Sequence, residues 1–302
     1  MEWLKTVKVF ESVIQNGSLS AAGRKFGLSP ASVSRHINEL ENDLGVRLLN
    51  RTSRRLSLTE AGSIYYDKVE EILLQIADAK NAARDLSTVP RGTLRVHARM
   101  FVGKMHVAPA LKRFVEIYPE IKFDLMMSNY PMDIVGKGFD VDIRIGKLVD
   151  SSLVARKLAS SRRILVASPE YLAKYPPIVH PTDLVDHSCL TYRLNLGIVV
   201  WRFRKEQQPD IEVPVDGILQ SDNGEAILTA TRDGLGICML NDWVIKDDLA
   251  AGRLVRVLDD YATSFGDFDN GIYAVFQKSR HLPLKTRVFV DFLSAEMKAA
   301  LA

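Results

Sequence analysis

A short stretch near the N-terminus, SPASVSRHIN, combines a helix start with side chains that suit nucleic-acid recognition. Ser29 and Pro30 predict the start of a helix, because the serine side chain can accept a backbone N–H and proline lacks the N–H that would be unpaired there. Counted at about 100° per residue, Arg35 and Asn38 lie opposite the apolar residue Val33. Arginine can bond guanine through two hydrogen bonds and asparagine suits adenine, so this face could read base edges.

Small and basic residues outside the face of Arg35 and Asn38 could also contact DNA. Ser32 and Ser34 lie on its flanks, where short side chains allow a close approach to a DNA edge. Further along, an NRTSRR tip between partly alternating residues predicts a small hairpin, or wing. Its arginines, Arg51, Arg54 and Arg55, could reach phosphates or a minor groove.

The positive charge of the chain is concentrated in this N-terminal segment. Residues 1–58 hold nine Lys and Arg against five Asp and Glu, although the net charge of all 302 residues is only +3. A local excess of this kind indicates a polyanionic partner for this segment and not for the rest of the chain. The length and the 47% hydrophobic content predict two or three globular domains.

Three short helices are expected to position these side chains. Apolar residues at helical spacing predict a first helix over 2–16, and a second helix follows Ser18 and ends at Gly27. The third begins after Ser29, ends at Gly45, and carries one apolar stripe facing the core: Val33, Ile37, Leu40 and Leu44. Two short helices joined by a tight turn predict a helix-turn-helix. The alternative is a small helical domain with an ordinary charged surface.

A long helix is expected next, from Thr59 to about Ser87, before Pro90 and Gly92 mark a hinge. Its apolar residues recur at spacings of four and three, as in a heptad seam: Tyr65, Val69, Ile72, Ile76, Ala79, Ala83 and Leu86. An isolated helix of this length needs a cover for such a stripe, so a coiled-coil-like dimer is predicted. In the alternative, the stripe packs on the second domain of the same chain.

From residue 93 onward, strands and helices alternate. Strands are expected over 93–100, 121–128 and 140–146, with a helix over 107–119 and a short helix over 132–138. A second set begins at 162–175 and includes 236–240, and a strand at 271–278 with a helix at 284–301 returns to complete the first lobe. This alternation predicts a largely parallel sheet in a two-lobed α/β fold, with ligands at the carboxyl ends of the strands.

The sequence argues against several classes of protein. It has no apolar run long enough to span a membrane and no signal-peptide pattern, so a cytoplasmic protein is expected. Cys189 and Cys238 lie in apolar runs and are expected to be buried thiols. The six histidines include no HExxH, and G-x-S-x-G, P-loop and paired-cysteine patterns do not occur. We therefore expect no catalytic residue, no metal site and no cofactor.

The N-terminal segment resembles the winged helix-turn-helix of LysR-type transcriptional regulators. The resemblance lies in its pattern of AA, G-S-P, SVSRHI, LE, LG, R-L, RT-R and L-LTEAG. It implies that the helix after Ser29 is the recognition helix and that the wing contacts flanking DNA. The implied DNA-contacting residues are Ser29, Pro30, Ser32, Ser34, Arg35 and Asn38, with Arg51, Arg54 and Arg55 facing the backbone.

The remainder resembles the effector domain of the same family, which is similar to type 2 periplasmic binding proteins. The matching stretches include GTLRV, VAPAL, FDVDIRIG, LVARKLA, ASPEYLAK and the GLGI run. A helix start at Ser221, Asp222 and Asn223 would offer free N–H groups to an anion. The effector pocket implied by the resemblance is lined by Ala98, Arg99, Met100, Phe101, Ser128, Asn129, Arg144, Ile145, Gly146 and Asn223.

Arg99 departs from the family pattern, in which small hydroxyl residues often follow the first strand. If its side chain points into the cleft, a carboxylate-bearing effector is favoured, because a guanidinium group matches the geometry of a carboxylate. If it points outward, Arg99 is a solvated surface residue.

These observations predict a multidomain regulator. The expected parts are a winged helix-turn-helix over 1–58, a linker and dimerisation helix with a hinge over 59–91, and a two-lobed effector domain over 92–302. Lobe I is expected over about 92–161 and 267–302, and lobe II over about 162–266. The expected partners are double-stranded promoter DNA, a small-molecule effector and further copies of the chain, as a homodimer or homotetramer, without a membrane. The alternative is a ligand-binding or enzymatic α/β module with incidental DNA affinity.

Overall fold

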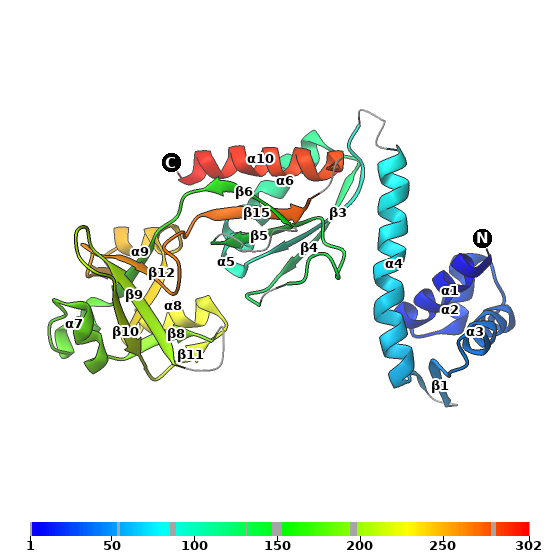
Figure 1. Ribbon diagram of the computed structural model, residues 1–302, viewed down its shortest axis with the longest axis horizontal. Coiled ribbons are helices and arrows are strands. Elements are labelled where there is room, and N and C mark those ends of the chain that lie inside the picture. The colour runs from blue at the N-terminus through cyan, green and yellow to red at the C-terminus, as the bar shows by residue number, and fades with distance from the viewer. Residues whose placement is uncertain are drawn as a thin grey trace. The chain divides into compact units, whose positions relative to one another are not determined.

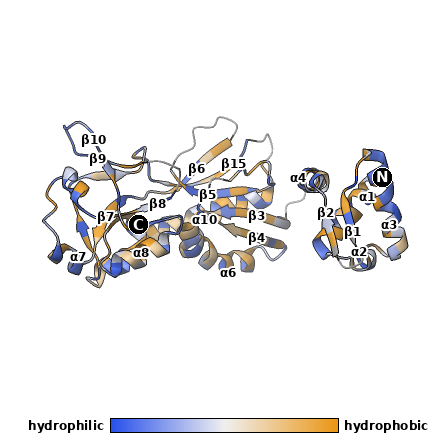
Figure 2. Cartoon of the chain, turned by 90° about the horizontal axis from the view of Figure 1, so that it is seen from below, coloured by the Kyte–Doolittle hydropathy of each residue, from blue (hydrophilic) through white to orange (hydrophobic). Residues whose placement is uncertain are grey.

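A computed structural model of the chain describes residues 2–52, 55–84, 89–130, 132–146, 153–193, 198–278 and 282–301. The protein consists of two compact units, an N-terminal unit that ends near residue 86 and a C-terminal unit formed by nearly all of the remaining chain. Figure 2 shows hydrophobic residues along strands of the C-terminal sheets and hydrophilic residues along parts of the N-terminal helices. No described helix is both long and apolar enough to cross a membrane.

The N-terminal unit contains the predicted helices and wing. Its elements are α1 (Glu2–Asn16), α2 (Leu19–Phe26), α3 (Pro30–Leu44), β1 (Leu49–Thr52), β2 (Arg55–Leu58) and α4 (Glu60–Arg84). The Ser18 hydroxyl accepts a hydrogen bond from the N–H of Ala21 at 3.4 Å, and the Ser29 hydroxyl accepts one from Ser32 at 3.1 Å. Gly27 and Gly45 end α2 and α3 with φ angles of 65° and 69°, a conformation that favours glycine. The helix boundaries predicted from capping residues are confirmed.

The core of this unit takes three of the four predicted residues from α3. Val33, Ile37 and Leu40 are buried, but Leu44 is 38% exposed, so its assignment to the core stripe was wrong. Leu44 is the last residue of α3, where the chain turns away at Gly45. The inward position one turn earlier is occupied by Glu41, which is buried.

Helix α4 covers part of its apolar face within its own unit. Tyr65, Val69 and Leu73 pack against Leu4 and Val7 of α1. The N-terminal part of the predicted seam is thus covered by the helix-turn-helix of the same chain, which neither sequence-based alternative anticipated. Ile72 belongs to the predicted seam and is 40% exposed, and Ile64, on the same helix, is 62% exposed. Leu86 and the side chains of Ala79 and Ala83 lie outside the described residues.

The C-terminal unit is built on two sheets (Figure 1). The first has the strand order β4-β3-β5-β15-β6, in which β3 is parallel to β4 and β5, and β15 is antiparallel to β5 and β6. Figure 1 shows the chain leaving this sheet through β6 and returning to it through β15. The strands are β3 (Gly92–Ala98), β4 (Ile121–Met127), β5 (Val141–Ile145), β6 (Leu153–Ala159) and β15 (Ile272–Gln277).

Helical segments accompany this first sheet. They are α5 (Met100–Val102), the π-helical turn η1 (Gly103–Val107), α6 (Ala108–Ile117) and α10 (Leu284–Leu301). Phe114 of α6 and Phe289 of α10 meet edge to face, with ring centroids 5.5 Å apart, in the core beside the sheet. The short helix predicted over 132–138 is a turn, in which the Phe139 N–H bonds the Ile134 carbonyl at 2.9 Å.

The second sheet has the order β10-β9-β14-β7-β12-β8-β11, with β13 also paired to β7. Among the described strands of this sheet, only β11 and β12 have a parallel neighbour, which is β8 in both cases, so the prediction of a largely parallel sheet is wrong for this lobe. The reason is local, because β9 and β10 form a hairpin and β12, β13 and β14 all return antiparallel to β7. The strands are β7 (Arg163–Ala167), β8 (Cys189–Tyr192), β9 (Val199–Arg204), β10 (Ile211–Val215), β11 (Gln220–Ser221), β12 (Ile237–Asn241), β13 (Val255–Val257) and β14 (Ala262–Ser264).

Short helices connect these strands. They are α7 (Pro169–Lys174), η2 (Pro181–Asp186), α8 (Gly224–Arg232), η3 (Asp242–Val244) and α9 (Lys246–Ala250). Cys189 and Cys238 are free and buried, and burial raises the pKa of both thiols to about 12. Both cysteines are therefore protonated packing residues, as the sequence predicted.

Candidate nucleic-acid interface and ligand cavity

The predicted reading face of α3 lies on the surface of the N-terminal unit. Arg35 and Asn38 are exposed, and Ser32 and Ser34 are half-buried on its flanks. The Arg35 side chain is 74% exposed, with its Nε 3.7 Å from Oε1 of Glu39. A surface pair at this distance contributes little to stability, so Arg35 can exchange its partner for a base or a phosphate.

Buried polar contacts fix α3 from behind. His36 is buried, and its Nδ1 lies 3.0 Å from the Thr6 hydroxyl of α1. The buried Glu41 carboxylate accepts hydrogen bonds from the N–H groups of Leu48 and Leu49 at 2.8 and 3.0 Å. The sequence analysis missed these contacts, although an acidic residue among core positions near the end of a helix is a signal that could have been followed.

The base of the wing is anchored by Thr59, the residue immediately before α4. The Thr59 hydroxyl donates to the Arg47 carbonyl at 2.7 Å and accepts from the Gly62 N–H at 2.9 Å. A Cβ at Gly62 would lie 2.0 Å from the Leu48 carbonyl oxygen, so only glycine allows this approach. β1 pairs with β2 in antiparallel register. Arg54 and the side chains of Arg51 and Arg55 lie outside the described residues.

A cavity of about 170 Å³ lies between the two lobes of the C-terminal unit. From the first lobe, it is lined by Arg99, Phe101, Asn129 and Ile145, all named from the sequence. The second lobe contributes residues that the sequence analysis missed: Arg163, Tyr192, Met239, Leu240, Asn241 and Phe265. The missed residues come from separate strands and loops, so no single stretch of sequence carries their pattern.

Arg99 points to the cavity and is held there by the loop after β4. Its guanidinium donates to the carbonyl of Asn129, whose side-chain oxygen accepts from the Met100 N–H at 3.2 Å. The Asn129 amide also donates to the Asp222 carbonyl of the second lobe at 2.7 Å. Burial lowers the pKa of Arg99, and the nearby charge of Asp142 opposes this effect. Arg99 therefore remains a cation in a partly desolvated place.

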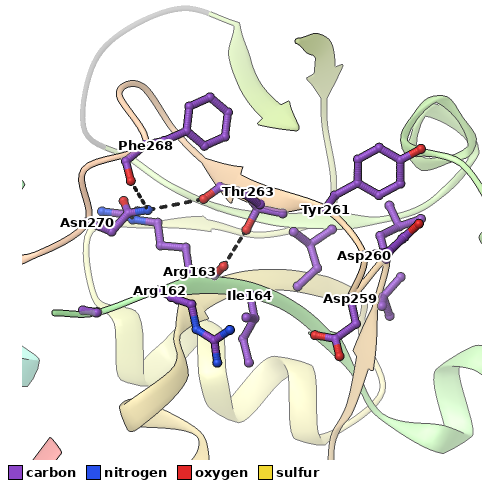
Figure 3. Close-up of a pocket in the computed structure, with 14 residues that line it drawn as sticks. Arg162, Arg163, Ile164, Asp259, Asp260, Tyr261, Thr263, Phe268 and Asn270 are labelled. Atoms are coloured by element: carbon purple, nitrogen blue, oxygen red, sulfur yellow. Dashed lines mark hydrogen bonds between the residues drawn. The ribbon is translucent and has the colours of Figure 1, made fainter. Parts of the chain in front are cut away.

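Arg163 faces the same cavity from the second lobe. Its Nε donates to Oδ1 of Asn270 at 2.9 Å, and its guanidinium carbon lies 4.2 Å from the ring centroid of Phe265. Burial lowers the pKa of Arg163 to about 10, so it is still charged at neutral pH. A neighbouring cavity on the second lobe has a volume of about 220 Å³. Arg163 and Asn270 also lie in its wall (Figure 3).

The structure places the other predicted pocket residues beside this cavity and not in its lining. Ala98 is fully buried in the first core, and Arg144 donates to the Asp142 carboxylate at 2.7 Å. Gly146 has a φ angle of 87° and bonds the Gly271 carbonyl. Asn223 caps α8, where its side chain accepts the Glu225 N–H at 2.9 Å.

A buried polar network links the three parallel strands β3, β4 and β5. His97 lies with Nδ1 2.8 Å from Asp142 and with Nε2 3.0 Å from the Ser128 hydroxyl. Burial of Asp142 raises its pKa, but the bonds from His97 and Arg144 outweigh this and leave the pKa below its usual value. The order serine–histidine–aspartate resembles a hydrolytic triad. Because the carboxylate here also bonds Arg144, we interpret these hydrogen bonds as structural. They hold the loop that carries Asn129 in place.

Several further contacts join the two lobes. The Tyr130 hydroxyl donates to the Asp222 carboxylate at 2.6 Å, and Lys104 pairs with Glu225. At the start of α8, a Cβ at Gly224 would lie 2.0 Å from the Tyr192 hydroxyl and 2.3 Å from Cε2 of Phe101. Glycine is thus required where aromatic residues from both lobes pack against the helix.

Both units match models of known protein families. The model of the bacterial regulatory helix-turn-helix protein, lysR family, matches residues 4–63, and that of the LysR substrate binding domain matches residues 87–298. An HTH-type transcriptional regulator of Xanthomonas campestris pv. campestris is 36% identical over 293 residues, covering 96% of this chain and 84% of the relative. The HTH-type transcriptional activator TtdR of Escherichia coli (strain UTI89 / UPEC) is 35% identical, covering 96% of this chain and 92% of that protein.

Solved structures of similar proteins cover nearly the whole chain. The full-length structure of the Vibrio cholerae virulence activator AphB has a TM-score of 0.66 at 32% identity, covering 97% of this chain and 98% of that one. CrgA from Neisseria meningitidis has a TM-score of 0.60 at 32% identity, with coverage of 97% and 98%.

Proposed function

Because the chain belongs to the LysR family of DNA-binding transcription regulators, which are not enzymes, we propose that it reads promoter DNA through α3 and responds to a small carboxylate bound between its lobes. The family has a helix-turn-helix domain followed by an effector-binding domain. We place the DNA-binding domain at 1–58, the linker at 59–91 and the effector domain at 92–302. In the last of these, lobe I takes 92–161 and 267–302, and lobe II takes 162–266.

The exposed polar face of α3 is the observation that carries the DNA-binding part of the proposal. Arg35 and Asn38 would contact base edges, because their side chains are exposed on a helix whose far side is locked by Glu41 and His36. Ser29, Pro30, Ser32 and Ser34 would approach phosphates or bases near the start of α3. Arg51, Arg54 and Arg55 of the wing would contact the DNA backbone.

A homodimer, or a homotetramer built from dimers, would present two such helices to the two halves of a promoter site. The exposed apolar residues Ile64 and Ile72 of α4 support this, since a second copy of the helix could cover them. The assembly matters for regulation, because a ligand shifts an equilibrium only through its different affinities for two states. We propose that the effector favours one arrangement of the assembly and so changes half-site spacing or DNA bend.

The position of Arg99 carries the effector part of the proposal. A guanidinium that lines a small cavity suits a carboxylate, with Phe101 as an apolar wall and Asn129 holding the arginine in place. The other predicted residues, Ala98, Met100, Ser128, Arg144, Gly146 and Asn223, would act from behind the lining by shaping its edge.

Gel-shift binding of the full-length protein to the DNA upstream of its own reading frame tests this function. A scrambled fragment of equal length is the control, and both are measured at two salt concentrations. Preferential, salt-sensitive retention of the upstream fragment is expected. Equal and weak retention of both fragments would contradict sequence-specific reading.

A further inference from the structure

Two arginines from opposite lobes face one cavity. Arg99 follows β3 in the first lobe, whereas Arg163 is the first residue of β7 in the second lobe. The positive charge of Arg99 lowers the pKa of Arg163, which means that the two guanidinium groups are close enough to repel each other. A pair of partly buried like charges is costly unless a negative charge lies between them.

The Asp142 carboxylate acts on Arg99, but it is itself bonded by His97 and Arg144 and does not pair with either cavity arginine. Neither Arg99 nor Arg163 forms an ion pair with a carboxylate among the described residues. The Arg163 Nε donates a hydrogen bond to the neutral amide of Asn270, and the guanidinium group lies over the ring of Phe265. Arg99 donates to a backbone carbonyl.

Other arginines of the same unit are neutralised by acidic partners. Arg144 pairs with Asp142, and Arg232 and Arg253 share the buried Asp248. On the surface, Arg204 pairs with Asp210 at 2.7 Å. The two cavity arginines have no such acidic partner among the described residues, and both line the cavity where the proposed effector would bind.

We propose that the effector is a compact dicarboxylate, one carboxylate bound by Arg99 and the other by Arg163. This inference rests on the proposed effector site and specifies its ligand class. The cavity volume of about 170 Å³ is well below the ~300–1,000 Å³ of pockets that hold drug-sized ligands, so the molecule is small. Phe101, Tyr192 and Phe265 provide walls for a short carbon chain. A ligand held at both ends ties the lobes together, which a monocarboxylate on Arg99 cannot do.

The test measures binding to the full-length protein by calorimetry and by thermal shift. The probes are malonate, succinate, glutarate and adipate, each beside the monocarboxylate of equal chain length, with inorganic phosphate as a single compact anion. The variants are Arg163→Gln, Arg163→Lys and Arg99→Gln. Arg162→Gln is the matched control, because Arg162 adjoins Arg163 in sequence but its side chain is 74% exposed and it does not line this cavity.

At least one dicarboxylate should bind the wild type about 10- to 100-fold more tightly than its monocarboxylate, the usual value of one charged hydrogen-bonded contact. Arg163→Gln should abolish this preference, Arg163→Lys should retain part of it, and Arg162→Gln should keep it. Circular dichroism checks that the variants fold. If Arg163→Gln does not fold, the partial loss of the preference in Arg163→Lys still tests the proposal.

Four results would overturn the proposal: no dicarboxylate binds, the monocarboxylates bind equally well, phosphate binds in their place, or the preference survives in Arg163→Gln. The experiment can also show that only the role of Arg163 is wrong. In that case monocarboxylates still bind the wild type and lose affinity in Arg99→Gln, so the proposed carboxylate site stands while the role of Arg163 falls. If monocarboxylates and dicarboxylates all bind Arg99→Gln as they bind the wild type, the carboxylate site itself is contradicted.

Discussion

The Oε1 atom of Glu41 accepts a hydrogen bond from the backbone N–H of Leu48 at 2.8 Å, and this contact ties α3 to the start of the wing. The same atom also accepts the N–H of Leu49, while Arg47 lies within 3.6 Å of the carboxylate. Because the carboxylate is buried, its loss leaves backbone donors without a partner.

Replacing Glu41 with Ala should therefore lower the free energy of unfolding of the N-terminal unit by about 1–3 kcal/mol. DNA affinity should fall with it, because the wing would no longer be held in register with α3. Chemical denaturation followed by circular dichroism measures the change, with the exposed Glu39→Ala as the matched control. An Ala variant at position 41 as stable as the control would show that these contacts contribute nothing.

Replacing Arg35 with Ala should weaken binding to a specific site by about 1–3 kcal/mol and leave the melting temperature unchanged. The side chain is exposed and weakly paired, so its removal disturbs no packing. Fluorescence anisotropy with specific and scrambled duplexes separates the two kinds of binding. Arg113→Ala, on the surface of the other unit, controls for the loss of one positive charge. Unchanged specific affinity would refute the assigned reading face.

Wing arginines should behave differently from Arg35. Arg55→Ala is expected to reduce affinity for specific and scrambled duplexes alike, because a backbone contact carries no sequence information. The slope of log affinity against log salt should become shallower by about one unit per lost phosphate contact. A loss confined to the specific duplex would instead assign Arg55 to base reading.

The N-terminal unit was predictable because its boundaries are set locally. Ser18, Ser29, Gly27 and Gly45 fix helix starts and ends through bonds within a few residues, and the sequence shows those residues directly. The prediction that Leu44 belongs to the core was wrong because burial depends on residues far from it in the sequence. Helical spacing predicts the direction in which Leu44 points from α3. It does not predict whether neighbouring segments extend far enough to bury this side chain.

The cavity was only half predictable. Residues that follow β3 and β4 were named through the family resemblance, and they meet in the cavity because the ends of parallel strands lie at one sheet edge. Arg163 could not, since it adjoins Arg162 at the start of β7, and successive side chains of an extended chain point to opposite faces. Which of the two meets the cavity depends on how the second sheet packs, and this is fixed by contacts from Asn270 and Phe265 about a hundred residues later.

Gly224 should not tolerate even a methyl group without a change in the cavity. An added Cβ would meet the Tyr192 hydroxyl and the Phe101 ring at distances no real contact shows, so both aromatic rings must move. Gly224→Ala should cost about 1–3 kcal/mol of stability and reduce binding of carboxylate probes. Gly266→Ala is the control, because no atom lies within 4 Å of a Cβ there. Equal behaviour of the two variants in thermal shift and calorimetry would contradict this.

The last prediction concerns His106, which is half-buried with its ring 4.8 Å from that of Trp243. Its Nε2 finds no hydrogen-bond partner among the described residues, and burial lowers its pKa below the usual 6.5. The unfolded chain therefore binds a proton more readily than the folded one. The stabilisation is complete above about pH 6.5 and is lost as the pH falls through the lower folded-state pKa.

Unfolding free energies measured between pH 8 and 5 should thus decline on the acidic side for the wild type, and His106→Leu should flatten that decline. The surface variant His180→Gln should keep the wild-type profile. Because the ring joins the π-helical turn η1 to Trp243 of the second lobe, the same titration should weaken contact between the lobes. Tryptophan fluorescence that shifts with pH in the wild type but not in His106→Leu would report this, and identical profiles in both proteins would exclude His106 as the titrating group.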